Sequence, residues 1–215
     1  MSAPRIFTPL NLLLLLLIAA ATIAGFFRLP AEAQLPVHYD IFGQPDRFAG
    51  RNEALILVPA IGLGMLALFW AIARFANPER LAGGRHVMAT VLPALLVMFL
   101  ALQVVLVFQL DAAVPNIVAW LVATLLVALG NVMPKSQPNR YGGIRIPSTL
   151  SDPANWAATH RLTGLAMMVA GGLLILLTLL TAEPVVLFTG ILVAVIVPLA
   201  MGVIYSMRFA QKGRG

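Results

Sequence analysis

The sequence predicts an all-α integral membrane protein with six transmembrane helices, and three observations lead to this prediction. Sixty percent of the 215 residues are hydrophobic and only 10% are charged. A soluble domain carries about 25% charged residues, so this chain has too few polar side chains to cover a surface in water. The mean hydropathy is +0.95, and the apolar residues occur in runs of about 20, the length that crosses a bilayer.

Six apolar runs have this length, and we expect spans at 8–27, 54–75, 87–110, 114–133, 158–181 and 185–207. The first run could be a signal peptide, because Ala19 to Ala21 supply small residues. The run continues past them to Phe27, however, and is long enough to span. A retained first helix is therefore favoured.

The connections and small residues indicate how these spans pack. Very short links near Asp111 and Glu183 require antiparallel pairs of spans three and four, and of spans five and six. Prolines inside spans remove a backbone hydrogen bond and predict kinks; these are Pro93 and Pro198. Ala166 with Ala170, or Gly164 with Gly171, would allow two helices to approach closely.

Basic residues are concentrated in alternate loops. With the N-terminus inside, eleven Lys and Arg residues lie inside and three outside. The inner ones are Arg5, Arg74, Arg80, Arg85, Lys135, Arg140, Arg145, Arg161, Arg208, Lys212 and Arg214, and the outer ones are Arg28, Arg47 and Arg51. Basic residues favour cytoplasmic loops, so both termini are expected to be cytoplasmic. The net charge of +6 is then interpreted as topology-setting and contact with anionic lipid headgroups, without direct nucleic acid binding.

The loop at 28–53 is predicted to lie outside, between the first two spans. Its prolines and glycines, Pro30, Pro36, Pro45, Gly43 and Gly50, break any helix. Residues 37–42 are compatible with a short extended segment, followed by a turn at 43–46. A partly extended outer loop is therefore expected.

The longest polar interruption in the second half of the chain is the segment 130–164, which is predicted to lie inside. Asp152 is expected to cap a helix that begins at Pro153 and runs unbroken into the fifth span. Arg140 and Arg145 flank a glycine pair, and guanidinium groups match phosphate or carboxylate.

Four residues of the new helix, Trp156, Thr159, His160 and Thr163, follow i, i+3, i+4, i+7 spacing and share one stripe. Two interpretations stay open at this point. In the first, Trp156 is an anchor at the lipid headgroups, His160 caps a neighbouring helix, and the arginines bind lipid phosphates. In the second, the same groups build a specific binding site, because an ionisable side chain near the hydrocarbon is costly and often functional.

The order of residues in this segment resembles the signature of the SdpI family, bacterial integral membrane proteins named for immunity to a secreted peptide toxin. The resemblance runs through Gly130-Asn131, Pro134-Lys135, NRYGGIRIPSTLS at 139–151, Asn155-Trp156 and Thr159-His160-Arg161. It implies a binding signature made of Asn131, Lys135, Asn139, Arg140, Gly143, Arg145, Pro147, Thr149, Trp156, Thr159, His160 and Arg161.

The outer loop resembles the short extracytoplasmic domain of unknown function that often precedes the SdpI region. The residues that carry this resemblance are Pro36, His38, Gly43, Asp46 and Arg51, with Arg51 where a Lys is common. The two resemblances imply an N-terminal two-helix region at 1–75 with the outer loop, and a four-helix SdpI-like region at 87–207.

Signals for an enzyme or a metal site are weak. The chain has no cysteine, no phosphate-binding loop, no HExxH and no GxSxG. His38, Asp40 and Asp46 are suitable metal ligand types, but a turn held by Asp and Pro side chains is favoured. We expect no metal, no cofactor and no catalysis.

The sequence therefore predicts a membrane-embedded immunity or sensor protein of the bacterial inner membrane. Its expected partners are anionic lipids, a toxic peptide from outside and a cytoplasmic repressor. The alternative is an enzyme or carrier for a lipid-linked phosphate, in which Arg140, Arg145 and Arg161 bind the phosphate and His160 acts as acid or base.

Overall fold

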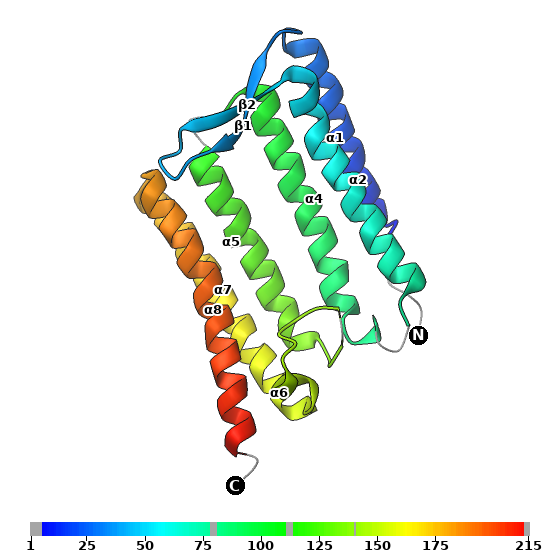
Figure 1. The fold of residues 1–215 in the computed structure, drawn as a ribbon, viewed down its shortest axis with the longest axis vertical. Helices are drawn as coiled ribbons and strands as arrows, with labels where there is room; N and C mark the ends of the chain where they lie inside the picture. The colour runs from blue at the N-terminus through cyan, green and yellow to red at the C-terminus, as the bar shows by residue number, and fades with distance from the viewer. Residues whose placement is uncertain (1–5, 78–80, 111–113, 140, 213–215) are drawn as a thin grey trace.

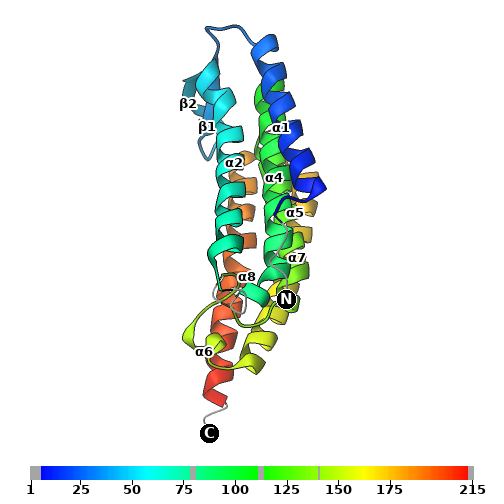
Figure 2. The same ribbon diagram turned by 90° about the vertical axis from the view of Figure 1, so that its right-hand side faces the viewer.

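The protein is described by a computed structural model of residues 6–77, 81–110, 114–139 and 141–212. Six of its helices are long and apolar enough to cross a membrane, which confirms the predicted fold class. They are α1 Pro9–Arg28, α2 Arg51–Phe75, α4 Arg85–Phe108, α5 Val114–Val132, α7 Pro153–Leu180 and α8 Pro184–Lys212. They stand side by side along the long axis of the molecule (Figures 1 and 2).

Capping side chains explain where α1 and α7 begin. The Thr8 hydroxyl accepts a hydrogen bond from the Asn11 N–H at 3.1 Å, and the Asp152 carboxylate accepts one from the Ala154 N–H at 2.8 Å. Each bond satisfies a backbone donor that has no partner within its helix. The predicted start at Asp152 and Pro153 is confirmed, and α7 runs unbroken to Leu180.

The helices pack in two groups of three. In the first group α1, α2 and α4 share a core that includes Leu14, Ile18, Leu66, Leu92 and Leu96. In the second group α5, α7 and α8 share a core that includes Ala119, Ala123, Leu126, Leu174, Leu187 and Ala194. The groups meet where α4 packs on α5. The predicted pairs of consecutive helices, α4 with α5 and α7 with α8, are therefore in contact, although the link at 111–113 lies outside the described residues.

A buried amide joins the three helices of the first group. Gln103 Nε2 donates to Thr22 Oγ1 at 2.9 Å and to the Leu55 carbonyl at 3.1 Å. Pro59 lies inside α2 and, four residues after Leu55, has no N–H to offer that carbonyl. Gln103 therefore satisfies an acceptor that the proline leaves without a helical partner, a role that the sequence analysis missed.

Close approach of α5 and α7 depends on glycine, as predicted for Gly164 and Gly171. A Cβ on Gly164 would lie 2.5 Å from the Gly130 carbonyl oxygen, and one on Gly171 would lie 2.7 Å from the Ala123 carbonyl oxygen. Side chains cannot occupy such distances, so the two helices are in backbone contact at these points.

The outer loop is a β-hairpin, with β1 Gln34–Tyr39 antiparallel to β2 Pro45–Gly50. The expected extended segment begins three residues earlier than predicted, and the turn lies at 40–44 rather than 43–46. The second strand was not predicted. Pro45 and Asp46, interpreted as turn residues, begin that strand, which is possible because a proline is tolerated in the first position of an edge strand.

The two ends of the bundle differ. The hairpin lies across one end, and at the other end α5 leads into the short helices η2 Met133–Lys135 and α6 Pro147–Leu150 before α7 begins (Figure 1). We call these the hairpin end and the signature end. Helix α1 begins and α8 ends at the signature end. Which end faces the cytoplasm stays a prediction from the charge distribution.

Candidate functional site

The stripe predicted on α7 forms one fully buried face. Trp156, Thr159, His160 and Thr163 each have a relative exposure of 0%. The loop between η2 and α6 folds over this face, and α8 covers its other side. These four side chains are therefore inside the protein, where buried polar atoms are normally hydrogen-bonded; of this stripe, Thr163 Oγ1 has no partner among the described residues.

Both ring nitrogens of His160 are engaged. The Ile144 N–H donates to Nε2 at 3.0 Å, so Nε2 carries no proton. The proton therefore sits on Nδ1, which lies 2.8 Å from the Trp156 carbonyl oxygen and donates to it. The imidazole also stacks on the Trp156 ring, with ring centroids 4.0 Å apart. His160 is thus a neutral residue that holds the loop against α7.

Trp156 lies inside this framework. Its Nε1–H donates to the Ser136 carbonyl at 3.1 Å, and the Ser136 hydroxyl donates to the Met133 carbonyl at 2.8 Å. A side chain without exposed surface cannot lie among lipid headgroups. The interpretation of Trp156 as an interfacial anchor is therefore wrong, because its indole N–H has a partner inside the protein.

The loop is shaped by side chains that bond to its own backbone. The Asn139 carboxamide oxygen accepts from the N–H groups of Tyr141 and Gly142, at 2.8 Å and 2.9 Å. The Thr149 hydroxyl donates to the Ile144 carbonyl at 2.7 Å. Gly143 has φ +101° and packs on the His160 ring, a conformation that glycine adopts without strain.

A second chain of polar contacts connects α7 to α8. Asn155 Nδ2 donates to the Ser206 carbonyl at 3.0 Å, and Thr159 Oγ1 donates to Asn155 Oδ1 at 2.9 Å. The hydroxyls of Ser148 and Ser206 lie 2.7 Å apart. Sequence reasoning did not assign roles to Ser136 and Ser206; the available signal was that small hydroxyl residues serve helix contacts in membranes.

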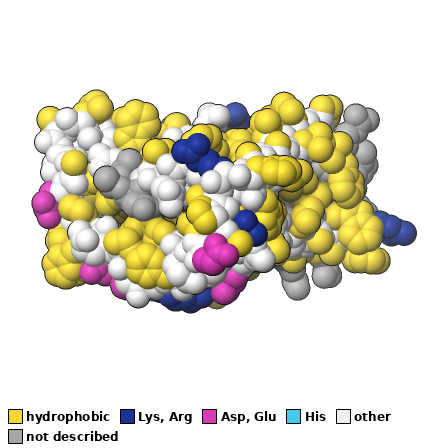
Figure 3. Space-filling model, turned by 90° about the horizontal axis from the view of Figure 1, so that it is seen from above, with side chains coloured by type: hydrophobic (Ala, Val, Ile, Leu, Met, Phe, Trp, Pro, Cys, Tyr) yellow, Lys and Arg dark blue, Asp and Glu magenta, His cyan; other side chains and the backbone are white. Residues whose placement is uncertain are grey.

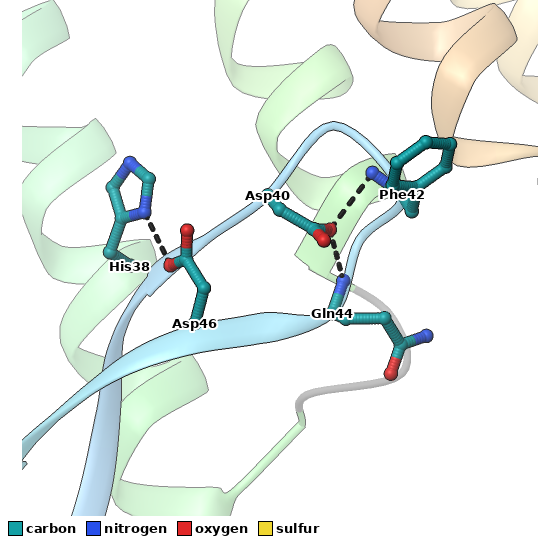
Figure 4. A network of polar contacts seen from close by, with 5 residues as sticks. All are labelled: His38, Asp40, Phe42, Gln44 and Asp46. Carbon is teal, nitrogen blue, oxygen red and sulfur yellow. Dashed lines mark hydrogen bonds and ion pairs between the residues drawn. The ribbon is translucent and has the colours of Figure 1, made fainter.

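At the hairpin end, the polar residues stabilise the turn (Figure 4). The Asp40 carboxylate accepts from the N–H groups of Phe42 and Gln44, both at 2.9 Å, and Gly43 has φ +73°. His38 Nδ1 lies 2.5 Å from Asp46 Oδ1, and both side chains are exposed. Among the described residues no group of three His, Cys, Asp or Glu side chains could hold a metal ion.

Arg51, the first residue of α2, holds the base of the hairpin against the end of α1. Its Nη1 donates to the Leu29 carbonyl at 3.1 Å and to the Phe26 carbonyl at 3.4 Å, and its guanidinium lies over the Phe26 ring. The last carbonyls of a helix have no partner within it, so a cation placed there is favourable. Pro36 lies in β1 opposite Phe48.

Residues 135–206 match the model of the SdpI/YfhL protein family, and residues 13–63 match the model described as Domain of unknown function (DUF1648). The SdpI/YfhL match covers 72 of the 215 residues. The resemblance inferred from the signature is therefore confirmed, and the protein is a multi-pass membrane protein. Comparisons with curated proteins and with solved structures find no match. The two matched ranges lie within the predicted regions 87–207 and 1–75, whose boundaries stay predictions.

The SdpI/YfhL signature divides into a buried framework and an exposed set. The exposed residues are Asn131, Lys135, Gly143, Arg145, Pro147 and Arg161. Arg140 lies outside the described residues. Arg85 and Arg208 are also exposed at this end, and Asp152 is the acidic residue described there. The signature end thus presents a basic surface around a closed polar core.

Replacing Arg51 with methionine is expected to loosen the DUF1648 hairpin. The change keeps the aliphatic stem but removes the hydrogen bonds of a charged donor. A bond of this kind contributes about 1.5–3 kcal/mol to the free energy of unfolding when buried, and less for this half-buried side chain. We expect a lower melting temperature in detergent and faster proteolysis between α1 and α2. Arg47→Met, on an exposed side chain of β2, is the matched control. Equal melting and cleavage in the two variants would contradict the anchoring role.

Proposed function

We propose that this protein is a membrane-embedded immunity or sensor protein, which protects its cell against a toxic antimicrobial peptide or detects such a peptide. The SdpI/YfhL region supports this proposal, since the family is named for immunity to a peptide toxin. The observation that carries it against the enzymatic alternative is that both ring nitrogens of His160 are engaged within the protein, which argues against proton transfer by this residue.

A general acid or base has to reach the proton it transfers. His160 uses Nε2 for the Ile144 N–H and Nδ1 for the Trp156 carbonyl, and it has no exposed surface. An enzyme or carrier that used His160 on a lipid-linked phosphate would first have to open this framework. The alternative function predicted from the sequence is therefore less well supported than immunity or sensing.

The exposed basic surface suits a second partner at the signature end. Lys135, Arg145 and Arg161 are exposed at this end, and clusters of basic residues attract anionic lipid surfaces. In the predicted orientation this surface faces the cytoplasm of a bacterial inner membrane, where a repressor could also bind. A peptide arriving from outside would meet the hairpin end.

Deletion of the gene tests the proposal. We expect deleted cells to be more sensitive to membrane-active peptides, and the wild-type gene to restore survival. Arg145→Gln and His160→Gln variants are compared with wild type at equal membrane levels, measured by immunoblot. Unchanged survival and unchanged transcription after deletion, across a panel of such peptides, would contradict the proposal.

A further inference from the structure

An apolar cavity of about 480 Å³ lies beneath the hairpin, in the seam between the two helix groups. Its walls come from α2, α4, α5 and α8, and its roof comes from hairpin residues 36–41 and 43. In Figure 1 the four helices that line the cavity stand below β1 and β2, with α4 and α5 between α8 and α2. A largely apolar cavity of this size with a few polar groups at its mouth has the character of a ligand pocket.

The hairpin closes the cavity by contacting both helix groups. At its base, Arg51 bonds to the carbonyls that end α1. At its tip, Gly43 packs on prolines in the first turns of α5 and α8; a Cβ there would lie 3.0 Å from Pro184 and 3.1 Å from Pro115. The roof is therefore fixed at two points on opposite sides of the seam.

The cavity also opens sideways. Leu57 and Ile61 of α2 and Phe188 of α8 line it, yet each keeps more than two fifths of its surface exposed. These residues lie on membrane-spanning helices, so the open side faces lipid. A ligand could enter from the membrane while its polar part stays at the hairpin.

Charge at the hairpin end favours a cation. The acidic residues described there are Glu32, Asp40, Asp46, Glu53 and Glu183, and the basic ones are Arg28, Arg47 and Arg51. Arg51 bonds to backbone carbonyls. Asp40 accepts from the Phe42 and Gln44 N–H groups through Oδ1 and lines the cavity, and Glu183 is exposed beside Pro184. Figure 3 views the molecule from this end, where acidic and basic groups both lie among hydrophobic side chains. Opposite charges across an interface guide partner choice.

We propose that this cavity binds the apolar side chains of a cationic amphipathic peptide, whose Lys and Arg groups face Asp40 and Glu183. The proposal rests on the proposed function and names its ligand class and binding site. A helix is about 10–12 Å across, so the cavity takes a few side chains of such a peptide rather than its backbone. Amphipathic peptides bury their apolar face at the headgroup boundary, and the cavity lies at the hairpin end of the spans, directly beneath the hairpin.

Filling the cavity provides the first test. The full-length protein is placed in nanodiscs of zwitterionic lipid and titrated with a fluorescent Lys/Leu amphipathic helix. Val118, which lines the cavity, is changed to tryptophan. We expect the affinity for the probe to fall at least about tenfold, because the indole would displace one apolar side chain of the ligand, whose burial contributes about that factor to binding. Val97→Trp, on a 45% exposed position of α4, is the matched control and should bind as wild type.

Neutralising the rim provides a second test that leaves the packing intact. Asp40→Asn keeps an oxygen for the Phe42 and Gln44 N–H groups, and it is combined with Glu183→Gln. We expect weaker binding with a smaller dependence on salt, because screening acts on exposed charges. Asp152→Asn removes one charge at the signature end and keeps a capping side chain, so it should leave binding unchanged.

Two results would overturn the proposal. One is wild-type affinity in both the Val118→Trp protein and the double rim variant. The other is equal binding of a probe whose lysines are replaced by glutamine, which would assign the cavity to an uncharged lipid chain. Failure of the proposed function looks different: the purified protein would bind the cationic probe at this cavity, while deletion of the gene would leave survival and transcription unchanged.

Discussion

Replacement of His160 by phenylalanine is expected to destabilise the protein by about 1–3 kcal/mol, because that is the cost of leaving one buried polar group without a partner. The Ile144 N–H would lose its acceptor, whereas the Trp156 carbonyl would lose a side-chain donor but keep the backbone N–H of residue 160 within α7. The aromatic ring retains much of the volume and the stacking on Trp156. A lower melting temperature in detergent and lower membrane levels are the expected measurements.

His160→Gln separates a structural from a chemical role. Glutamine can still offer an oxygen to the Ile144 N–H, so most of the stability should return, although an amide cannot transfer protons as imidazole does. We expect peptide protection per folded molecule to be close to wild type. Normal folding with complete loss of protection would show that His160 acts directly on a ligand, contrary to the framework described above.

The six spans were predictable because their signal is averaged over many residues. A run of about 20 apolar residues has few alternatives to a membrane helix, and the observed helices contain nearly all of each predicted range. The start of α7 was equally predictable, since Asp152 and Pro153 act through adjacent backbone groups. Such local causes are visible in a sequence without knowledge of the fold.

Trp156 shows where the sequence was insufficient. Its position at the membrane end of a span predicts an anchor, and only the tertiary structure reveals that Ser136, twenty residues earlier, accepts its indole N–H. The same is true of Gln103, whose partners Thr22 and Leu55 are far away in the chain. A polar residue in a span indicates that a partner exists, but its identity depends on how the helices pack.

The hairpin illustrates a third case, in which the local sequence contained signals for a turn between two strands, although only one extended segment was predicted. Gly43 adopts a positive φ and Asp40 accepts backbone hydrogen bonds, which together fix the turn. The strands on either side, β1 and β2, have six residues each. The cavity below could not be foreseen, because it is lined by residues from the hairpin and four helices. Sites formed between distant segments require the arrangement of those segments.

Substitution of Gly164 by valine is expected to disrupt the SdpI/YfhL region more than any lipid-facing change. The added Cβ alone would lie 2.5 Å from the Gly130 carbonyl oxygen and 3.0 Å from Pro134 Cδ. The obstructing atoms belong to backbone and to a rigid ring, so α5 and α7 would have to separate. Overpacking of a tight contact costs about 1–3 kcal/mol and sometimes more, and the separation would also weaken the nearby Trp156 and His160 contacts.

The same helix supplies the control. Gly172 has open space around its Cβ position, and valine there gains apolar surface towards lipid without meeting another helix. We expect Gly172→Val to melt as wild type or slightly higher, since glycine inside a helix costs about 0.5–1 kcal/mol relative to alanine. If Gly164→Val and Gly172→Val had equal melting temperatures and membrane levels, the backbone contact between α5 and α7 could not be what holds the signature in place. If only Gly164→Val lowered the melting temperature and the membrane level, the signature framework would depend on that backbone contact, because α7 carries both Trp156 and His160.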